Sequence, residues 1–72
     1  MIYPYKIETK EDLYRVSELA SHEDYPIYIS TEYGLIDAKS ILALFTILGK
    51  EINIVAPDHA DSKDFIAFIS KL

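Results

Sequence analysis

The chain has 72 residues, of which 50% are apolar, and its 12 acidic and 7 basic side chains give a formal net charge of −5. This length predicts one domain, near the lower size at which a hydrophobic core holds a chain together without staples. The acidic balance disfavours binding to nucleic acids and to anionic membrane surfaces. The sequence contains no cysteine, which excludes disulfides and thiolate-rich zinc sites.

No targeting or membrane-spanning segment is evident in the sequence. Residues Met1–Lys6 lack the basic region followed by an apolar run that marks a secretory signal. The longest apolar stretch, Ile41–Leu48, is too short to span a bilayer. We therefore expect a cytoplasmic domain.

The first predicted elements are a strand and a helix. Tyr3, Tyr5 and Ile7 alternate with Pro4 and Lys6, a pattern typical of a strand, and Pro4 indicates either an edge strand or the start of a strand. The helix is expected to begin at Thr9, whose hydroxyl caps it, with an acidic residue three positions later as in a capping box. The apolar residues that follow recur on one helical face: Leu13, Val16, Leu19 and Ala20.

A hairpin is predicted next. Tyr25–Ser30 is rich in β-forming residues, and Leu35–Ala38 is the returning strand. The turn between them, Glu32–Gly34, ends in a glycine that tolerates positive φ.

A second helix, a fourth strand and a third helix complete the chain. Ser40 is expected to cap a helix over Ile41–Leu48, with Gly49 as its C′ residue. Glu51–Val55 alternates as a strand. The last helix is capped by Asp61 or Ser62, and its apolar stripe consists of Phe65, Phe68, Ile69 and Leu72. The order β-α-β-β-α-β-α predicts an α+β fold with helices packed on one face of an antiparallel sheet. This order resembles that of HPr proteins and that of ferredoxin-like domains with an added helix, and the pattern alone does not choose between them.

The residues around the second helix resemble one family in particular. Asp37–Leu42 is similar to the segment of HPr, the histidine-containing phosphocarrier protein of the sugar phosphotransferase system, in which a strand runs into the short helix that bears a regulatory serine. Ala43–Ile54 resembles the continuation of that segment, apart from a short deletion before Gly49. The likeness covers nearly the whole chain, but its specific part is Asp37–Ile54. It implies a single HPr-like domain over residues 1–72, an open-faced β-sandwich with a four-stranded antiparallel sheet and three helices on one face.

The carrier site of the family is missing from this sequence. HPr proteins place a histidine just before the first helix and an arginine two residues later, so that the phosphoryl group lies at a helix N-terminus. The aligned positions here are Thr9 and Glu11. A threonine phosphate ester is too stable to pass its phosphate on, and Glu11 repels an anion where the family attracts one. The resemblance therefore predicts an HPr-like protein with no catalytic residue and no carrier function.

The two histidines of the chain are elsewhere. His22 is expected near the C-terminal end of the first helix, where the helix dipole disfavours a phosphoryl dianion. His59 precedes the last helix among several aspartates. Both are interpreted as exposed turn residues, and neither has a second histidine or a cysteine at metal-ligand spacing, so no metal site and no cofactor are expected.

Ser40 is the candidate regulatory residue. Its structural role is that of a helix N-cap, and the family resemblance adds phosphorylation by an ATP-dependent kinase. The two roles are compatible, because the phosphate would lie at a helix N-terminus. Glu11 and Asp37 would oppose the added charge if they lie close to Ser40.

The second helix is apolar on nearly all sides, so a single sheet cannot bury all of it. At the positions of Ile41, Leu42 and Phe45, the family uses the outward face of this helix to dock partner proteins. We consider two interpretations: a protein interface, including a homodimer through this helix, or a helix that sinks deeper into the core because the connection after it is shortened.

Three functions remain open from the sequence. The first is a non-enzymatic HPr-like domain that binds another protein in the regulation of sugar phosphotransfer. The second is a working component of that system, acting through Ser40 or an unexpected histidine. The third is a ferredoxin-like ligand-binding regulatory module, which the packing of the strands and of the last helix would distinguish.

Overall fold

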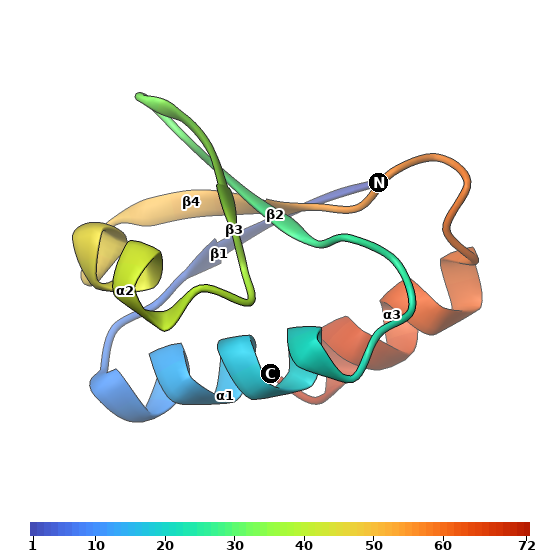
Figure 1. Ribbon diagram of the computed structural model, residues 1–72, viewed down its shortest axis with the longest axis horizontal. Coiled ribbons are helices and arrows are strands. Elements are labelled where there is room, and N and C mark those ends of the chain that lie inside the picture. The colour runs from blue at the N-terminus through green and yellow to red at the C-terminus, as the bar shows by residue number, and fades with distance from the viewer.

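The computed structural model describes residues 1–72 as four strands, three α-helices and one 3₁₀ turn (Figure 1). The bounds of these elements in chain order are β1 (Ile2–Lys6), α1 (Lys10–Ser21), β2 (Tyr28–Thr31), β3 (Gly34–Asp37), α2 (Ile41–Leu44), η1 (Phe45–Ile47), β4 (Glu51–Val55) and α3 (Ser62–Ser70). The predicted element order is thereby confirmed. No helix of this chain combines the length and the apolar character that crossing a membrane requires.

The strands form one antiparallel sheet in the order β1-β4-β2-β3. The last strand of the chain, β4, lies between β1 and β2, so the two central strands are β4 and β2. A ferredoxin-like sheet of the 4-1-3-2 type has β4 at an edge instead, and the topology therefore does not support the ferredoxin-like alternative.

Pro4 fits its strand because β1 is an edge. Met1 and Ile7 accept hydrogen bonds through their carbonyl groups from the backbone N–H groups of Ala56 and Gly49. Alternate residues of β1 therefore turn their backbone toward β4, and Pro4, one residue out of phase, turns its ring nitrogen toward the free edge. No hydrogen bond of the sheet is lost, and the prediction of an edge strand is confirmed.

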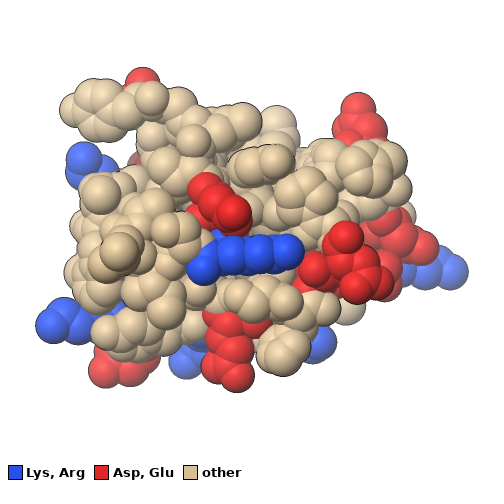
Figure 2. All heavy atoms as spheres, viewed as in Figure 1, with Lys and Arg blue, Asp and Glu red and all other residues tan.

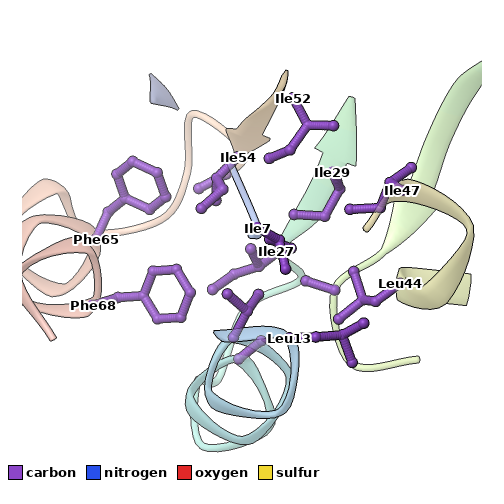
Figure 3. Packing of buried hydrophobic residues seen from close by; sticks show 14 of the residues in the cluster. Ile7, Leu13, Ile27, Ile29, Leu44, Ile47, Ile52, Ile54, Phe65 and Phe68 are labelled. Atoms are coloured by element: carbon purple, nitrogen blue, oxygen red, sulfur yellow. The ribbon is translucent and has the colours of Figure 1, made fainter. Parts of the chain in front are cut away.

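The core lies between the sheet and the helices. Ile52 and Ile54 of β4 alternate inward with Ile29 of β2, and Figure 3 shows Phe65 and Phe68 directed toward them from α3. Leu13 enters the core from α1, and Leu44 and Ile47 close it on the side of α2 and η1 (Figure 3). The opposite face of the sheet carries no helix (Figure 1).

The second helix is shorter than the sequence predicts. Its α-helical turn ends at Leu44, and the chain continues as a 3₁₀ turn to Ile47. Leu44 and Ile47 are both buried, and a 3₁₀ turn aligns side chains three residues apart, so tightening this segment directs both into the core. Gly49 follows with a φ of 82°, which confirms its position as the C′ residue.

The first strand of the hairpin is also shorter than predicted. The interpretation began it at Tyr25, whereas β2 begins at Tyr28. Pro26 has no N–H group to contribute to a strand ladder, which explains the late start. Pairing nevertheless extends one residue outside β2, because the N–H group of Ala38 donates to the carbonyl of Ile27 at 3.0 Å.

Candidate functional site

The N-terminus of α1, where the family resemblance places the carrier histidine, is closed by its own side chains. The Thr9 hydroxyl accepts a hydrogen bond from the N–H of Asp12 at 3.1 Å, and the Asp12 carboxylate accepts one from the N–H of Thr9 at 3.3 Å. This is a complete capping box, as the sequence pattern indicates. Two backbone donors of this region are therefore already used by the chain itself.

The charges around this helix end disfavour a bound anion. Asp12 also accepts a hydrogen bond from the Arg15 guanidinium at 3.2 Å, so the nearest guanidinium is paired with a carboxylate. Glu11, in the first turn of the helix, is exposed and forms no salt bridge. Burial raises the pKa of Tyr5, and the negative charge of Asp12 raises that pKa further. Carboxylates therefore lie at this helix end, where a bound phosphoryl group would require N–H groups without other partners.

Both histidines lie far from this end of α1 in the chain. His22 is the C-cap of α1, at the opposite end of the helix, and is exposed. His59 is exposed in the loop between β4 and α3. No cluster of three or more histidine, cysteine, aspartate or glutamate side chains is placed to hold a metal ion.

Ser40 caps α2, as the sequence predicts. Its Oγ accepts a hydrogen bond from the N–H of Ala43 at 3.3 Å. Its own N–H donates to the carbonyl of Asp37 at 3.0 Å, and the Asp37 carboxylate accepts from the N–H of Lys39 at 2.8 Å. Ser40 is half-buried. The hydrogen bonds of Asp37 keep this acidic residue next to Ser40.

The turn formed by α2 and η1 divides its apolar residues between the core and the solvent. Leu44 and Ile47 are buried, whereas Leu42 is 83% exposed, Ile41 42% and Phe45 39%. The three residues that the family resemblance assigns to partner docking are therefore the three that stay outside. The alternative in which the shortened connection lets the whole helix sink into the core is not the arrangement of this structure.

Tyr14 of α1 extends this exposed group. Its ring meets that of Phe45 edge to face, with centroids 6.2 Å apart and planes at 81°. We call Tyr14, Ile41, Leu42 and Phe45 the α2 surface. The sequence pattern does not predict that Tyr14 belongs to this surface. The structure places it there because α1 packs beside α2: Ser17, a neighbour of Tyr14 on α1, donates a hydrogen bond to the Lys39 carbonyl just before α2.

A second apolar region lies between β1 and α3. A shallow groove of about 520 Å³ there is lined by Met1, Ile2, Tyr3, Ser62, Phe65, Ile66 and Ile69. Ile2 and Ile66 on its rim are 69% and 66% exposed. The sequence pattern does not predict this groove, because its lining residues come from the two ends of the chain.

One buried hydroxyl has no partner. Tyr25, in the connection between α1 and β2, is buried, and its Oη makes no hydrogen bond. Burial raises the pKa of Tyr25 to about 12, and the negative charges of Glu23, Asp64 and Asp61 contribute to the shift. The phenol is neutral at physiological pH and is not part of the α2 surface.

Known structures share this architecture, although no protein-family model and no curated protein matches the sequence. HPr-C-His from Thermoanaerobacter tengcongensis superposes with a TM-score of 0.74 at 15% identity, covering 97% of this chain and 88% of that one. The phosphocarrier protein HPr from Bacillus anthracis str. Ames superposes with a TM-score of 0.72 at 15% identity, covering 100% of this chain and 95% of that one. Together with the strand order and the arrangement of the helices, these superpositions show that the chain has the HPr-like fold.

Proposed function

We propose that this chain is a non-enzymatic HPr-like domain that binds another protein through the α2 surface and takes part in the regulation of sugar phosphotransfer. The observation that carries the proposal is the exposure of Leu42, Ile41 and Phe45 on a turn whose other large apolar residues, Leu44 and Ile47, are buried. Figure 2 supports it, because the surface over α2 in this view carries no acidic or basic side chains. Exposed apolar patches of this kind are typical of protein interaction sites.

The closed capping box argues against a carrier role. A phosphoryl group at the N-terminus of α1 would compete with the Asp12 carboxylate for the N–H of Thr9 and for Arg15. Thr9 would hold phosphate as a stable ester rather than as a transferable phosphoramidate. The link to sugar phosphotransfer rests on the fold shared with proteins described as HPr, and the loss of the carrier function rests on Thr9 and Glu11.

Ser40 supports a second candidate, a phosphotransferase component regulated by phosphorylation. The residue caps the turn that carries the α2 surface, so a phosphate there would add negative charge beside the docking side chains. Asp37 is bonded through its backbone to Ser40 and would oppose that charge, which weighs against this candidate.

Intact-protein mass after two incubations separates these functions. One incubation contains phosphoenolpyruvate and the general phosphotransferase enzyme I, and the other contains ATP and the HPr serine kinase. We expect no added mass in the first. An acid-labile phosphate there contradicts the proposal and directs attention to His22 and His59. An acid-stable phosphate in the second, lost in Ser40→Ala, establishes the second candidate.

The binding role is tested by affinity capture with matched variants. Leu42→Lys changes the α2 surface, and Ile66→Lys makes the same chemical change at an exposed isoleucine of α3. A partner captured by the unmodified protein and by Ile66→Lys, but lost with Leu42→Lys, supports docking through the α2 surface. Capture that is equal with both variants places the interaction elsewhere and contradicts the proposal.

A further inference from the structure

The free edge of β1 carries backbone groups that have no partner within the chain. The carbonyl groups of Met1 and Ile7 are bonded on the inner side of the strand, toward β4. Because backbone groups alternate in direction along a strand, those of Ile2, Pro4 and Lys6 point away from β4. All three residues are exposed, and no strand lies beyond β1. A strand edge in this state pairs with another strand.

The groove between β1 and α3 runs beside this edge. Its wall on α3 includes Phe65, Ile66 and Ile69, and its volume is about 520 Å³. Figure 1 shows the N-terminal end of β1 on the same side of the molecule as α3. A second hollow of about 360 Å³ lies further along the same strand and is lined by Pro4, Tyr5, Lys6, Glu51 and Ile52. The two hollows together accompany β1 from its first residue to its last.

The register of the sheet determines which side chains of an added strand face the groove. Tyr3 is paired with Ile54, which is buried beneath the helices, so Tyr3 lies on the helix side of the sheet. A residue directly opposite Tyr3 on an added strand sends its side chain to that same side, toward the groove. Its two neighbours, opposite Ile2 and Pro4, turn their backbone groups toward β1. The edge and the groove thus match the main chain and the alternate side chains of one extended peptide.

We propose that β1 and α3 bind an extended peptide of another protein, which adds to the sheet as an antiparallel strand and inserts an apolar side chain into the groove. The site is separate from the α2 surface, so the inference goes beyond the proposed function. Ile2 and Lys6 each offer an N–H and a carbonyl to the peptide, and Pro4 offers its carbonyl alone. The net charge of −5 favours a peptide without an excess of acidic residues.

Pro4 distinguishes this partner from a second copy of the chain. Two β1 strands paired antiparallel about Pro4 place one proline opposite the other, so that neither carbonyl at this position meets a donor. A peptide with any other residue there supplies the N–H that the Pro4 carbonyl accepts. The edge is therefore better matched to a foreign strand than to its own copy.

Selection from a displayed library of random seven-residue peptides supplies the probe. A selected peptide, synthesised with a fluorescent label, is expected to bind the unmodified protein and Leu42→Lys with similar dissociation constants. Ile66→Lys makes the same chemical change on the rim of the groove and is expected to weaken binding at least tenfold. Fluorescence anisotropy measures the three affinities. Ile66 is 66% exposed, so the variant is expected to remain folded, and its amide spectrum checks this.

Hydrogen exchange and peptide methylation test the main-chain part of the proposal. The amides of Ile2 and Lys6 are expected to exchange at least tenfold more slowly when the peptide is bound. Those of Tyr3 and Tyr5 already face β4 and serve as controls that change little. Methylation of a peptide nitrogen that faces β1 is expected to abolish binding, whereas methylation of the next nitrogen, which faces solvent, is not.

Several results overturn the inference. One is a library from which no peptide is enriched. Another is a peptide lost with Leu42→Lys and kept by Ile66→Lys, which places it on the α2 surface and leaves the proposed function intact. Binding that methylation leaves unchanged at every position would show that the groove takes apolar groups without strand pairing.

The amide of Ile2 also reports on self-pairing. Protection of this amide that rises with protein concentration in the absence of peptide would show that a second copy covers the edge, and it contradicts the proposal. Peptide binding at β1 without any capture through Leu42 supports this inference and contradicts the proposed function. The two sites can therefore fail independently of each other.

Discussion

Thr9 and Asp12 hold each other at the start of α1: each backbone N–H donates to the side chain of the other, at 3.3 Å from Thr9 and 3.1 Å from Asp12. The pair occupies the helix end at which the resemblance to HPr proteins would place a phosphoryl group. The same residues that stabilise the helix therefore occupy two of the backbone donors that an anion would use.

Thr9→Ala is expected to destabilise the protein by about 1 kcal/mol, because it removes the acceptor for the N–H of Asp12. Urea unfolding followed by circular dichroism measures the change. Lys10→Ala is the control, since Lys10 is exposed in the same turn and its replacement is expected to cost less than about 0.5 kcal/mol. Equal stability of Thr9→Ala and the unmodified protein would show that the capping box contributes nothing.

Two leucines of one turn, separated by a single residue, are expected to differ sharply in their contribution to stability. Leu44 is fully buried and Leu42 is 83% exposed. Leu44→Ala leaves a cavity and is expected to cost about 2–5 kcal/mol, which is a large part of the stability of a small domain. Leu42→Ala is expected to change the free energy of unfolding by less than about 0.5 kcal/mol. Denaturant midpoints of the two variants compare them directly, and similar losses would show that the turn is oriented differently.

Gly49 is expected to tolerate a side chain sterically but not conformationally. Its φ is 82°, and no heavy atom lies within 4 Å of the position that a Cβ would occupy. Gly49→Ala is therefore expected to cost about 1–2 kcal/mol through the left-handed backbone alone. Gly49→Asn is expected to cost less, because asparagine enters this region more readily. Thermal unfolding of both variants measures the order, and a more stable alanine variant would contradict it.

Local patterns predicted the elements of this fold well because most of its residues follow them. Thr9, Ser40 and Asp61 all cap helices as their side chains suggest, and Phe65 and Phe68 face the core. The even hydrophobicity of residues 41–48 did not show which side chains would be buried, because helical periodicity distinguishes faces only when one of them is polar. That division follows from the 3₁₀ turn, which tertiary packing imposes.

The remaining features depend on contacts between distant segments. Tyr14 reads as one exposed residue of an amphipathic helix, and its edge-to-face contact with Phe45 exists only because α1 and α2 pack together. The groove between β1 and α3 joins residues from the two ends of the chain, from Met1 to Ile69. The capping of Thr9 by Asp12, in contrast, is local, and this part of the candidate site could be predicted from the sequence.

Tyr25 is expected to make stability fall at alkaline pH. Its pKa is raised from the usual 10.0 to about 12 in the folded protein by burial, with Glu23 and Asp64 adding to the effect. The unfolded chain then loses the phenolic proton at a lower pH than the folded protein does. The contribution of Tyr25 to the free energy of unfolding is therefore complete below pH 10 and is lost as the pH rises toward 12. The expected loss from this residue is on the order of 2–3 kcal/mol.

Tyr25→Phe tests this prediction with a change of one atom. The Tyr25 hydroxyl is buried without a hydrogen-bond partner, so its removal is expected to leave stability at pH 7 unchanged or to raise it by about 1 kcal/mol. Urea unfolding at a series of pH values from 8 to 12 measures both effects. Because Tyr5 also has a raised pKa and remains in the variant, some alkaline destabilisation persists, and the difference between the two curves isolates Tyr25. Parallel pH curves for the two proteins would mean that the pKa of Tyr25 is not raised by folding. A Tyr25→Phe variant that is less stable at pH 7 would mean that the Tyr25 hydroxyl makes a hydrogen bond in solution.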